Sequence, residues 1–214
     1  MSNPVVITFK DTSFAIVTGY GSTSPITGIT NANPAVVSQT GHGKADNDVV
    51  KLDSVGGMTE VNGENFVIEV IDADSYRLLN CDATNYNAYT SGGTAAKATF
   101  STTCQVSQYG GPTGTTPITT VDSSCGSTKV LGTPQHGAAQ ISFAVARQAY
   151  IDKLIDANAS GEKVVHRYTL PRNMGHRFDI GYVTVVDPGS AQVNGNWTGS
   201  ATIERTERFI DVEA

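Results

Sequence analysis

The chain has 214 residues, of which 39% are hydrophobic and only 16% charged, and its formal net charge at pH 7 is −6. This low-charge composition with 22 glycines is typical of strands and turns, and it argues against a disordered chain or a coiled coil. No apolar run approaches the ~20 residues of a membrane span, the N-terminus has no secretory pattern, and the negative charge argues against general nucleic-acid binding. We therefore expect no membrane partner, and a chain that stays in the cytoplasm in which it is made.

The first hundred residues predict strands and turns only. Residues 5–18 (VVITFKDTSFAIVT) have the alternation of strands, and GYGSTSP at 19–25 predicts a turn. Five short strands are then expected, at 26–29, 35–39, 48–53, 65–70 and 75–79, with turns at Gly41–His42, Gly56–Gly57, Asn62–Gly63 and Asp72–Ala73 between them. Strands at this spacing are typical of a compact barrel.

Residues 25–98 form a segment with its own character. They hold nine acidic and four basic residues, a net charge of −5, and they end in the polar, glycine-rich NYNAYTSGGTAA. We predict a small β-barrel domain at 25–98, inserted into a host domain made of residues 1–24 and 99–214.

The host continues with strands and a single helix. Strand patterns resume at residue 99, the stretch 110–117 (GGPTGTTP) predicts turns, and further strands are expected at 128–131, 138–146, 164–171, 176–186 and 196–210. In the strand 138–146, Ile141, Phe143 and Val145 share one face. The stretch AYIDKLIDANAS has helical spacing, which places Ile151, Leu154, Ile155 and Asn158 on one stripe and Asp152 in water. Gly161 is expected to end this helix in a left-handed conformation.

No arrangement of residues predicts catalysis or a cofactor. The three cysteines form no CxxC pair and are expected to be free buried thiols, and the four histidines lie in unrelated contexts without a GxSxG elbow. Asp46, Asp48 and Asp53 lack the spacing of a calcium loop, so a solvated face is the better interpretation. The chain is expected to be neither an enzyme nor a metal protein.

Basic residues cluster around one predicted strand–turn–strand. The cluster consists of His166, Arg167, Arg172, His176 and Arg177. It could contact an acidic neighbour or DNA, or it could be a polar hairpin tip. We favour a subunit contact through Arg167, Arg172, His176 and Arg177, because the rest of the chain supplies the acidic partner and no aromatic residues are interleaved for base stacking.

The order of these signals resembles a known family. AIVTGYGSTSP, VSQYGGPTGTTPITTVDSS, LGTPQHGAAQISFAVA, AYIDKLIDANASGEKVVHRYTLP, FDIGYVTVV and GNWTGSATIERTE are similar, in this order, to segments of tail tube proteins (major tail proteins) of long, non-contractile-tailed, siphovirus-type bacteriophages. The segment 25–98, with ITGITNANPAVV and GGMTEVNGENFVIEVIDADSYRL, resembles a small β-barrel module that recurs in phage tail proteins.

The resemblance implies a mainly β fold, a tail-tube β-sandwich or half-barrel with one α-helix plus the inserted barrel. It implies a structural virion protein whose hexameric rings stack into the tail tube, located in the virion tail and, before assembly, in the host cytoplasm. The implied partners are further copies of the chain, the tape measure protein, the tail terminator and the distal tail or baseplate proteins. DNA would pass through the bore during genome ejection without specific binding, and the barrel would lie on the outer surface.

Two other interpretations stay open. The chain could be a minor tail or decoration protein whose barrel binds a host surface, or it could be a tube protein of the type VI secretion kind.

Overall fold

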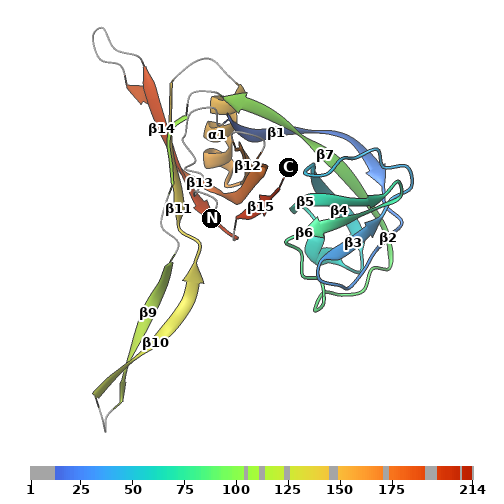
Figure 1. The fold of residues 1–214 in the computed structure, drawn as a ribbon, viewed down its shortest axis with the longest axis horizontal. Coiled ribbons are helices and arrows are strands. Elements are labelled where there is room, and N and C mark those ends of the chain that lie inside the picture. Colours follow the sequence, from blue (N-terminus) through green and yellow to red (C-terminus); the bar gives the residue numbers. More distant parts are fainter. Residues whose placement is uncertain are drawn as a thin grey trace, which may run out of the picture. The chain divides into compact units, whose positions relative to one another are not determined.

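The computed structural model describes residues 13–103, 106–110, 114–122, 126–144, 149–170, 174–190, 197–207 and 209–213. These residues are mostly strands (Figure 1), which confirms the mainly β fold class. The elements of the first half are β1 (Ser13–Pro25), β2 (Gly28–Ile29), β3 (Ala35–Ser38), β4 (Val49–Gly56), the 3-10 turn η1 (Thr59–Val61), β5 (Asn65–Asp72), β6 (Ser75–Leu79) and β7 (Ser91–Thr103). Those of the second half are β8 (Val106–Gly110), β9 (Gly114–Asp122), β10 (Gly126–Gln135), β11 (Ala138–Ala144), α1 (Ala149–Ser160), β12 (Lys163–Thr169), β13 (His176–Ser190), β14 (Thr198–Arg205) and β15 (Ile210–Val212).

The chain forms two compact units, described separately below. The first unit comprises the described residues of 1–102, 165–178 and 210–214, and the second comprises those of 103–164 and 179–209. In the first unit the strand order is β2-β3-β6-β5-β4-β7-β1-β12, and the start of β13 pairs with β15. In the second unit the order is β13-β14-β11-β8, while β9 and β10 form a sheet of their own.

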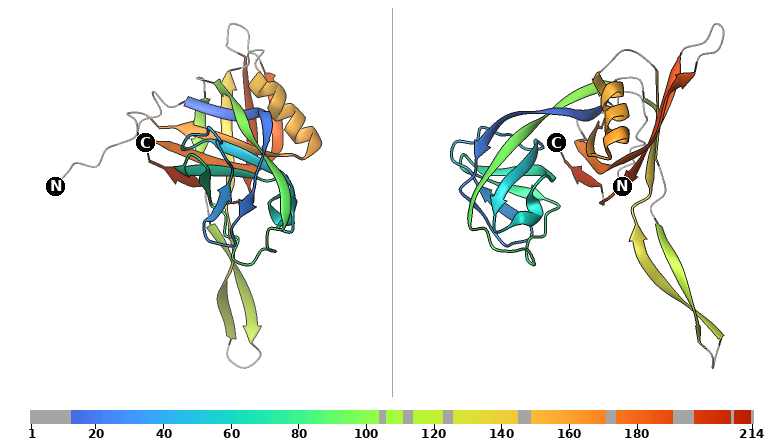
Figure 2. Two further views of the ribbon diagram at one scale, coloured as in Figure 1. Left: turned by 90° about the vertical axis from the view of Figure 1, so that its right-hand side faces the viewer. Right: turned by 180° about the vertical axis from the view of Figure 1, so that it is seen from behind.

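The strands β2–β6 curl, together with the adjoining ends of β1 and β7, into a small barrel within the first unit (Figure 2). Burial alternates along β3 and β6, as expected for strands with one face in a core and the other in water. The core is aliphatic around one aromatic residue, with Leu52, Ile68, Tyr76 and Leu78 fully buried. The five predicted strands of this segment are therefore present, although the first is only two residues long.

The predicted ends of the insertion lie in long strands. The turn expected at 19–25 is wrong, because β1 continues without interruption from Ser13 to Pro25. A Cβ on Gly19 would make a tight contact, at 3.3 Å, with the Thr99 hydroxyl, whereas one on Gly21 would lie at an ordinary van der Waals distance, 3.6 Å, from the Lys97 carbonyl. The exit SGGTAA is likewise the start of β7. The predicted segment 25–98 lies wholly within the first unit, whereas residues 99–214 contribute to both units.

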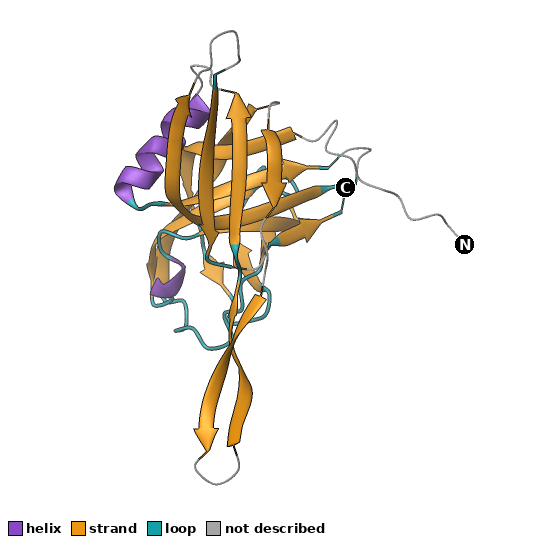
Figure 3. Ribbon diagram, turned by 90° about the vertical axis from the view of Figure 1, so that its left-hand side faces the viewer, coloured by secondary structure: helices purple, strands orange, loops and turns teal. Residues whose placement is uncertain are grey.

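In the second unit, α1 packs against one face of the β13–β14–β11 sheet (Figure 3). Tyr150 meets Phe143 of β11 edge-on at 5.8 Å between ring centroids, and the Asn158 side-chain amide donates to the Val183 carbonyl at 2.9 Å. Gly161 follows the helix with φ +68° and donates to the Ala157 carbonyl at 2.9 Å, which confirms the predicted C-terminal cap.

The buried stripe of α1 differs from the predicted one. Tyr150, Ile151, Leu154 and Ala157 are buried, whereas Ile155 is 42% exposed, so its predicted burial is wrong. The face is rotated because Tyr150 and Ala157, not Ile155, complete the contact with the sheet. Ile141 and Phe143 of β11 lie on one face as predicted, and both are buried, whereas Val145 lies outside the described residues.

Candidate assembly surface

The β9–β10 hairpin of the second unit forms a sheet that is separate from the β13-β14-β11-β8 sheet. Its strands pair antiparallel with each other, from Gly126 opposite Asp122 to Gln135 opposite Gly114, and they form a separate two-stranded sheet. The hairpin extends away from β11 and β14 as a twisted ribbon (Figure 3). The turn predicted at 110–117 is therefore partly wrong, since β9 begins at Gly114.

An isolated two-stranded ribbon is marginally stable in water and carries two free edges. Pro117 and Pro134, which cannot donate a backbone hydrogen bond, both lie in the half of this ribbon nearer to β11. The distal half, where residues 118–122 pair with 126–130, contains no proline and is rich in β-branched residues. Its outer backbone groups can thus accept another strand along both edges.

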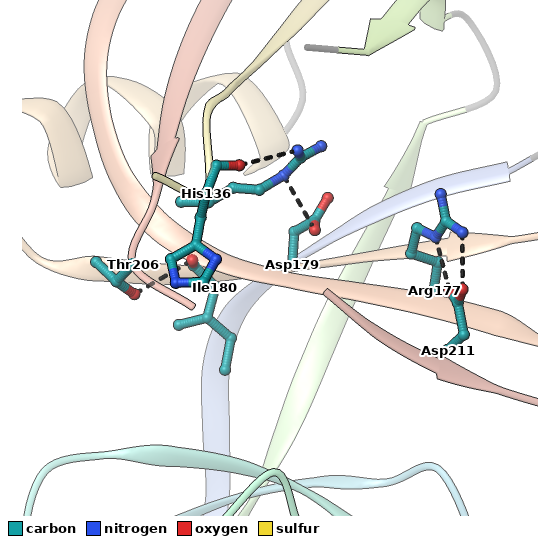
Figure 4. Close-up of polar contacts among 7 residues, drawn as sticks. His136, Arg177, Asp179, Ile180, Thr206 and Asp211 are labelled. Carbon is teal, nitrogen blue, oxygen red and sulfur yellow. Dashed lines mark hydrogen bonds and ion pairs between the residues drawn. The ribbon is translucent and has the colours of Figure 1, made fainter. Parts of the chain in front are cut away.

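A buried ion pair lies beside the root of this hairpin. The Arg205 Nε of β14 lies 3.2 Å from an Asp179 carboxylate oxygen of β13, and the two side chains are 5% and 1% exposed. The Arg205 guanidinium also donates to the His136 carbonyl at 3.4 Å, and its backbone N–H donates to the Gly137 carbonyl at 3.2 Å. His136 and Gly137 are the two residues that connect β10 with β11. Figure 4 shows the Asp179 carboxylate and the His136 carbonyl in this cluster.

The sequence contained a signal for this pair that went unused. Ala201 and Ile203 are buried at alternate positions of β14, and Arg205 is the next position of the same face. Asp179 lies between the buried Phe178 and Ile180 of β13. A charge at an inward strand position needs a partner of opposite charge, and these were the two candidates on neighbouring strands.

The opposite face of the β13–β14–β11 sheet is solvated. Its cross-strand rows, in the order β13, β14 and β11, are Tyr182–Glu204–Ala138, Val185–Thr202–Gln140 and Asp187–Ser200–Ser142. None of the nine is buried, and the charged residues among them, Glu204 and Asp187, are both acidic. Because these rows contain no lysine or arginine, they offer no cation to a phosphate backbone.

The predicted basic cluster makes contacts within the first unit. Arg177 forms a two-pronged ion pair with Asp211 of β15, at 2.6 and 2.7 Å (Figure 4). The His176 Nδ1 lies 3.1 Å from the Thr169 hydroxyl. Arg172 lies outside the described residues.

Arg167 of this cluster lies on β12 beside an aromatic ring. Its guanidinium lies 4.3 Å from the ring centroid of Phe100, and burial lowers the pKa of Arg167. Burial and the nearby Arg167 charge also lower the pKa of His176. The structure thus gives three of the four predicted residues a contact within their own chain, and their contact with another subunit stays a prediction.

His166, the fifth member of the basic cluster, lies in the core. It is 0% exposed, it pairs with Ile16 of β1, and its ring lies 5.2 Å from that of Phe14. Neither ring nitrogen has a hydrogen-bond partner among the residues that the structure describes, and burial lowers the pKa of His166 to about 3. The side chain is therefore neutral at pH 7, and it belongs to the packing of β1 on β12.

Two of the acidic residues considered for calcium make contacts with other residues of the first unit. Asp46 accepts from the Val70 N–H at 2.6 Å, and Asp48 accepts from the Ala45 N–H and pairs with Lys97 at 2.7 Å. Within the part of the chain that the structure describes, no group of three or more His, Cys, Asp or Glu side chains could hold a metal ion. Among the described helices, none has the length and apolar character to cross a bilayer. Cys81 is a buried thiol that forms no disulfide among the described residues, as predicted, and Cys104 and Cys125 lie outside the described residues.

One family model matches part of the chain. Residues 32–98 match the ubiquitin-activating enzyme E1 FCCH domain. The matched residues are less than half of the chain. They are similar to a β-rich domain, and they lie within the predicted insertion 25–98. No curated protein matches the chain.

Proposed function

We propose that this chain is a structural virion protein that assembles with copies of itself into hexameric rings, and that the rings stack into the tail tube of a long, non-contractile-tailed bacteriophage. The observation that carries the proposal is the β9–β10 hairpin, a ribbon whose two strands pair only with each other among the described residues. A ribbon with two free edges gains stability by pairing with another chain. When the contact joins different surfaces of identical chains, it generates rings or filaments.

The order of sequence motifs supports the phage class, and the solvated sheet face supports a conduit. A bore lined by hydroxyl, amide, carboxylate and a few apolar groups, without cations, lets DNA pass without binding, because no phosphate finds a cationic partner there. In this proposal the further partners are the tape measure, tail terminator and distal tail or baseplate proteins, and the barrel of residues 25–98 lies on the outer surface of the tube.

The test is self-assembly of the purified protein with and without the hairpin. We expect rings or tubes by negative-stain microscopy and light scattering at high concentration. Replacing residues 117–131 by a short Gly-Ser turn removes the distal ribbon and leaves the root and the sheet in place, so this variant should be folded and monomeric. A wild-type chain that stays monomeric even with tail initiator components, or a truncated chain that assembles equally well, would sink the proposal.

A second variant tests where the barrel lies. Replacing residues 27–96 by a short Gly-Ser linker should leave a soluble protein that forms thinner tubes, because the barrel strands largely satisfy one another's hydrogen bonds. Loss of tubes in this variant, with the remaining strands still folded by circular dichroism, would place the barrel in the ring contacts.

One alternative that the sequence leaves open is a decoration or minor tail protein whose barrel, residues 25–98, binds a host surface. Copy number in purified virions separates the two functions, since a tube protein is among the most abundant components and a minor protein is not.

A further inference from the structure

The hairpin and the sheet of the second unit are joined, along the described chain, by a very short connection. Only His136 and Gly137 lie between the end of β10 and the start of β11. Pairing of β11 with β14 begins at once, with Ala138 opposite Glu204. On this side of the ribbon, the backbone angles of two residues therefore help to set the direction in which it leaves the sheet, and Gly137, at φ +68°, is the more permissive of the two.

Arg205 binds both residues of this connection. Its guanidinium donates to the His136 carbonyl and its backbone N–H donates to the Gly137 carbonyl. The side chain is itself held by Asp179 on the next strand. Strands β13 and β14 run close together here, since a Cβ on Gly181 would clash with the Glu204 carbonyl oxygen. The Thr206 N–H also donates to the Ile180 carbonyl at 3.0 Å, just beyond the pair.

We propose that the buried Asp179–Arg205 pair fixes the direction of the β9–β10 hairpin, and that Arg205 is thereby a positioning residue for self-assembly. The second half of this statement rests on the proposed function. Stability alone does not explain the pair, because well-packed apolar residues of similar size serve a core as well as a buried ion pair or better. An apolar pair could not, however, donate to the His136 carbonyl.

Fixing the ribbon's direction matters because assembly selects one orientation. A ribbon that rotates freely about Gly137 is in the orientation needed to pair with a neighbouring chain only part of the time. Each binding event must then fix that orientation, which costs conformational entropy. A ribbon that is already oriented binds without that entropic cost.

The experiment measures the hairpin in the monomer and assembly separately. Spin labels are placed on cysteines introduced at Lys129 in the hairpin and Asp152 on the exposed face of α1, with Cys104 and Cys125 replaced by serine. Pulsed electron paramagnetic resonance at low concentration should give one narrow distance distribution. The double variant Asp179→Leu with Arg205→Met removes the charges and keeps an apolar core, so it should unfold at the same or a higher denaturant concentration. Its distance distribution should be clearly broader, and its critical concentration for assembly should rise about tenfold.

Matched variants separate positioning from folding. Arg205→Lys keeps the ion pair but lacks the planar fork that reaches both Asp179 and His136, so it should give a distribution of intermediate width. Arg177→Met with Asp211→Leu removes an ion pair from the first unit and should leave the hairpin distances unchanged. An unchanged distribution in the Asp179→Leu, Arg205→Met variant, or a broad one in the unmutated monomer, would overturn the anchoring role. A broader distribution with unchanged assembly would overturn the positioning role. Because the distances are measured on monomers, these outcomes are distinguishable from a wild-type chain that forms no tubes.

Discussion

The packing of α1 gives the sharpest test of the fold, because two consecutive large aliphatic residues of this helix lie on different faces, one buried and one exposed. Leu154 is 0% exposed and Ile155 is 42% exposed. Leu154→Ala removes buried methyl groups and leaves a cavity. Core substitutions of this kind lower the free energy of unfolding by about 2–5 kcal/mol. The rigid rings of Tyr150 and Phe143, stacked edge-on nearby, limit how far the site can collapse. We therefore expect a loss of about 3 kcal/mol in the free energy of unfolding.

Ile155→Ala is the matched control. It removes a similar number of carbon atoms from a largely solvated position, and alanine has the higher helix propensity. The expected change is within about 0.5 kcal/mol. Asp152→Ala on the water-facing side should be as small.

The assay is urea unfolding of the monomeric fraction, followed by tryptophan fluorescence. Trp197, the single tryptophan, directly precedes β14 in the same unit as α1, so its emission reports on this unit. With a urea dependence of about 1–3 kcal/mol per M, a loss of 3 kcal/mol lowers the midpoint by about 1–3 M. Equal midpoints for Leu154→Ala and Ile155→Ala would mean that the contact face of α1 has been assigned wrongly.

Two further predictions concern the first unit. The pKa of His166 is about 3 in the folded chain and near 6.5 in the unfolded chain. Between these pH values only the unfolded state binds a proton on His166. The contribution of His166 to the free energy of unfolding is therefore complete above about pH 6.5, and it falls by about 1.4 kcal/mol per pH unit as the pH drops towards 3. His166→Leu should remove this part of the acid dependence in unfolding curves at pH 7 and pH 5, and an unchanged difference between the two pH values would contradict the burial of a neutral ring. The Arg177–Asp211 pair is partly exposed, so Asp211→Asn should lower the free energy of unfolding by no more than about 1 kcal/mol. A much larger loss of stability in thermal unfolding would contradict the assignment of this pair as a surface ion pair.

The sequence predicted the helix well because its signals are local. The periodicity of the apolar residues and the glycine at position 161 both act within one or two turns, and neither depends on distant parts of the chain. The choice between Ile155 and the pair Tyr150 and Ala157 was not local. Tyrosine and alanine are found both in cores and at surfaces, and here the sheet face that α1 contacts, including Phe143 of the preceding strand β11, decides which stripe is buried.

The Asp179–Arg205 pair could have been predicted only in part. Alternation along β14 places Arg205 on the same face as Ile203, which marks it as an inward charge. Its partner depends on which strand lies beside β14 and in which register, and register is a property of the assembled sheet. The second partner of Arg205, the His136 carbonyl, lies 69 residues away in the connection between β10 and β11. No sequence pattern indicates this hydrogen bond.

The strands that enter and leave the barrel show why glycine signals mislead at domain boundaries. A run such as GYGSTSP contains the residues that turns require, and a short strand on either side of a turn is the simplest prediction from it. Glycine also occurs inside a strand, where a Cβ on Gly19 would lie 3.3 Å from the Thr99 hydroxyl of β7 and one on Gly21 would lie at an ordinary contact distance from the Lys97 carbonyl. Composition alone does not separate a turn glycine from one inside a strand. The distinction comes from the partner strand: where β7 runs alongside as a continuous strand, β1 continues through the glycines, and the boundary of the barrel is set by the curvature of two long strands instead of by a linker.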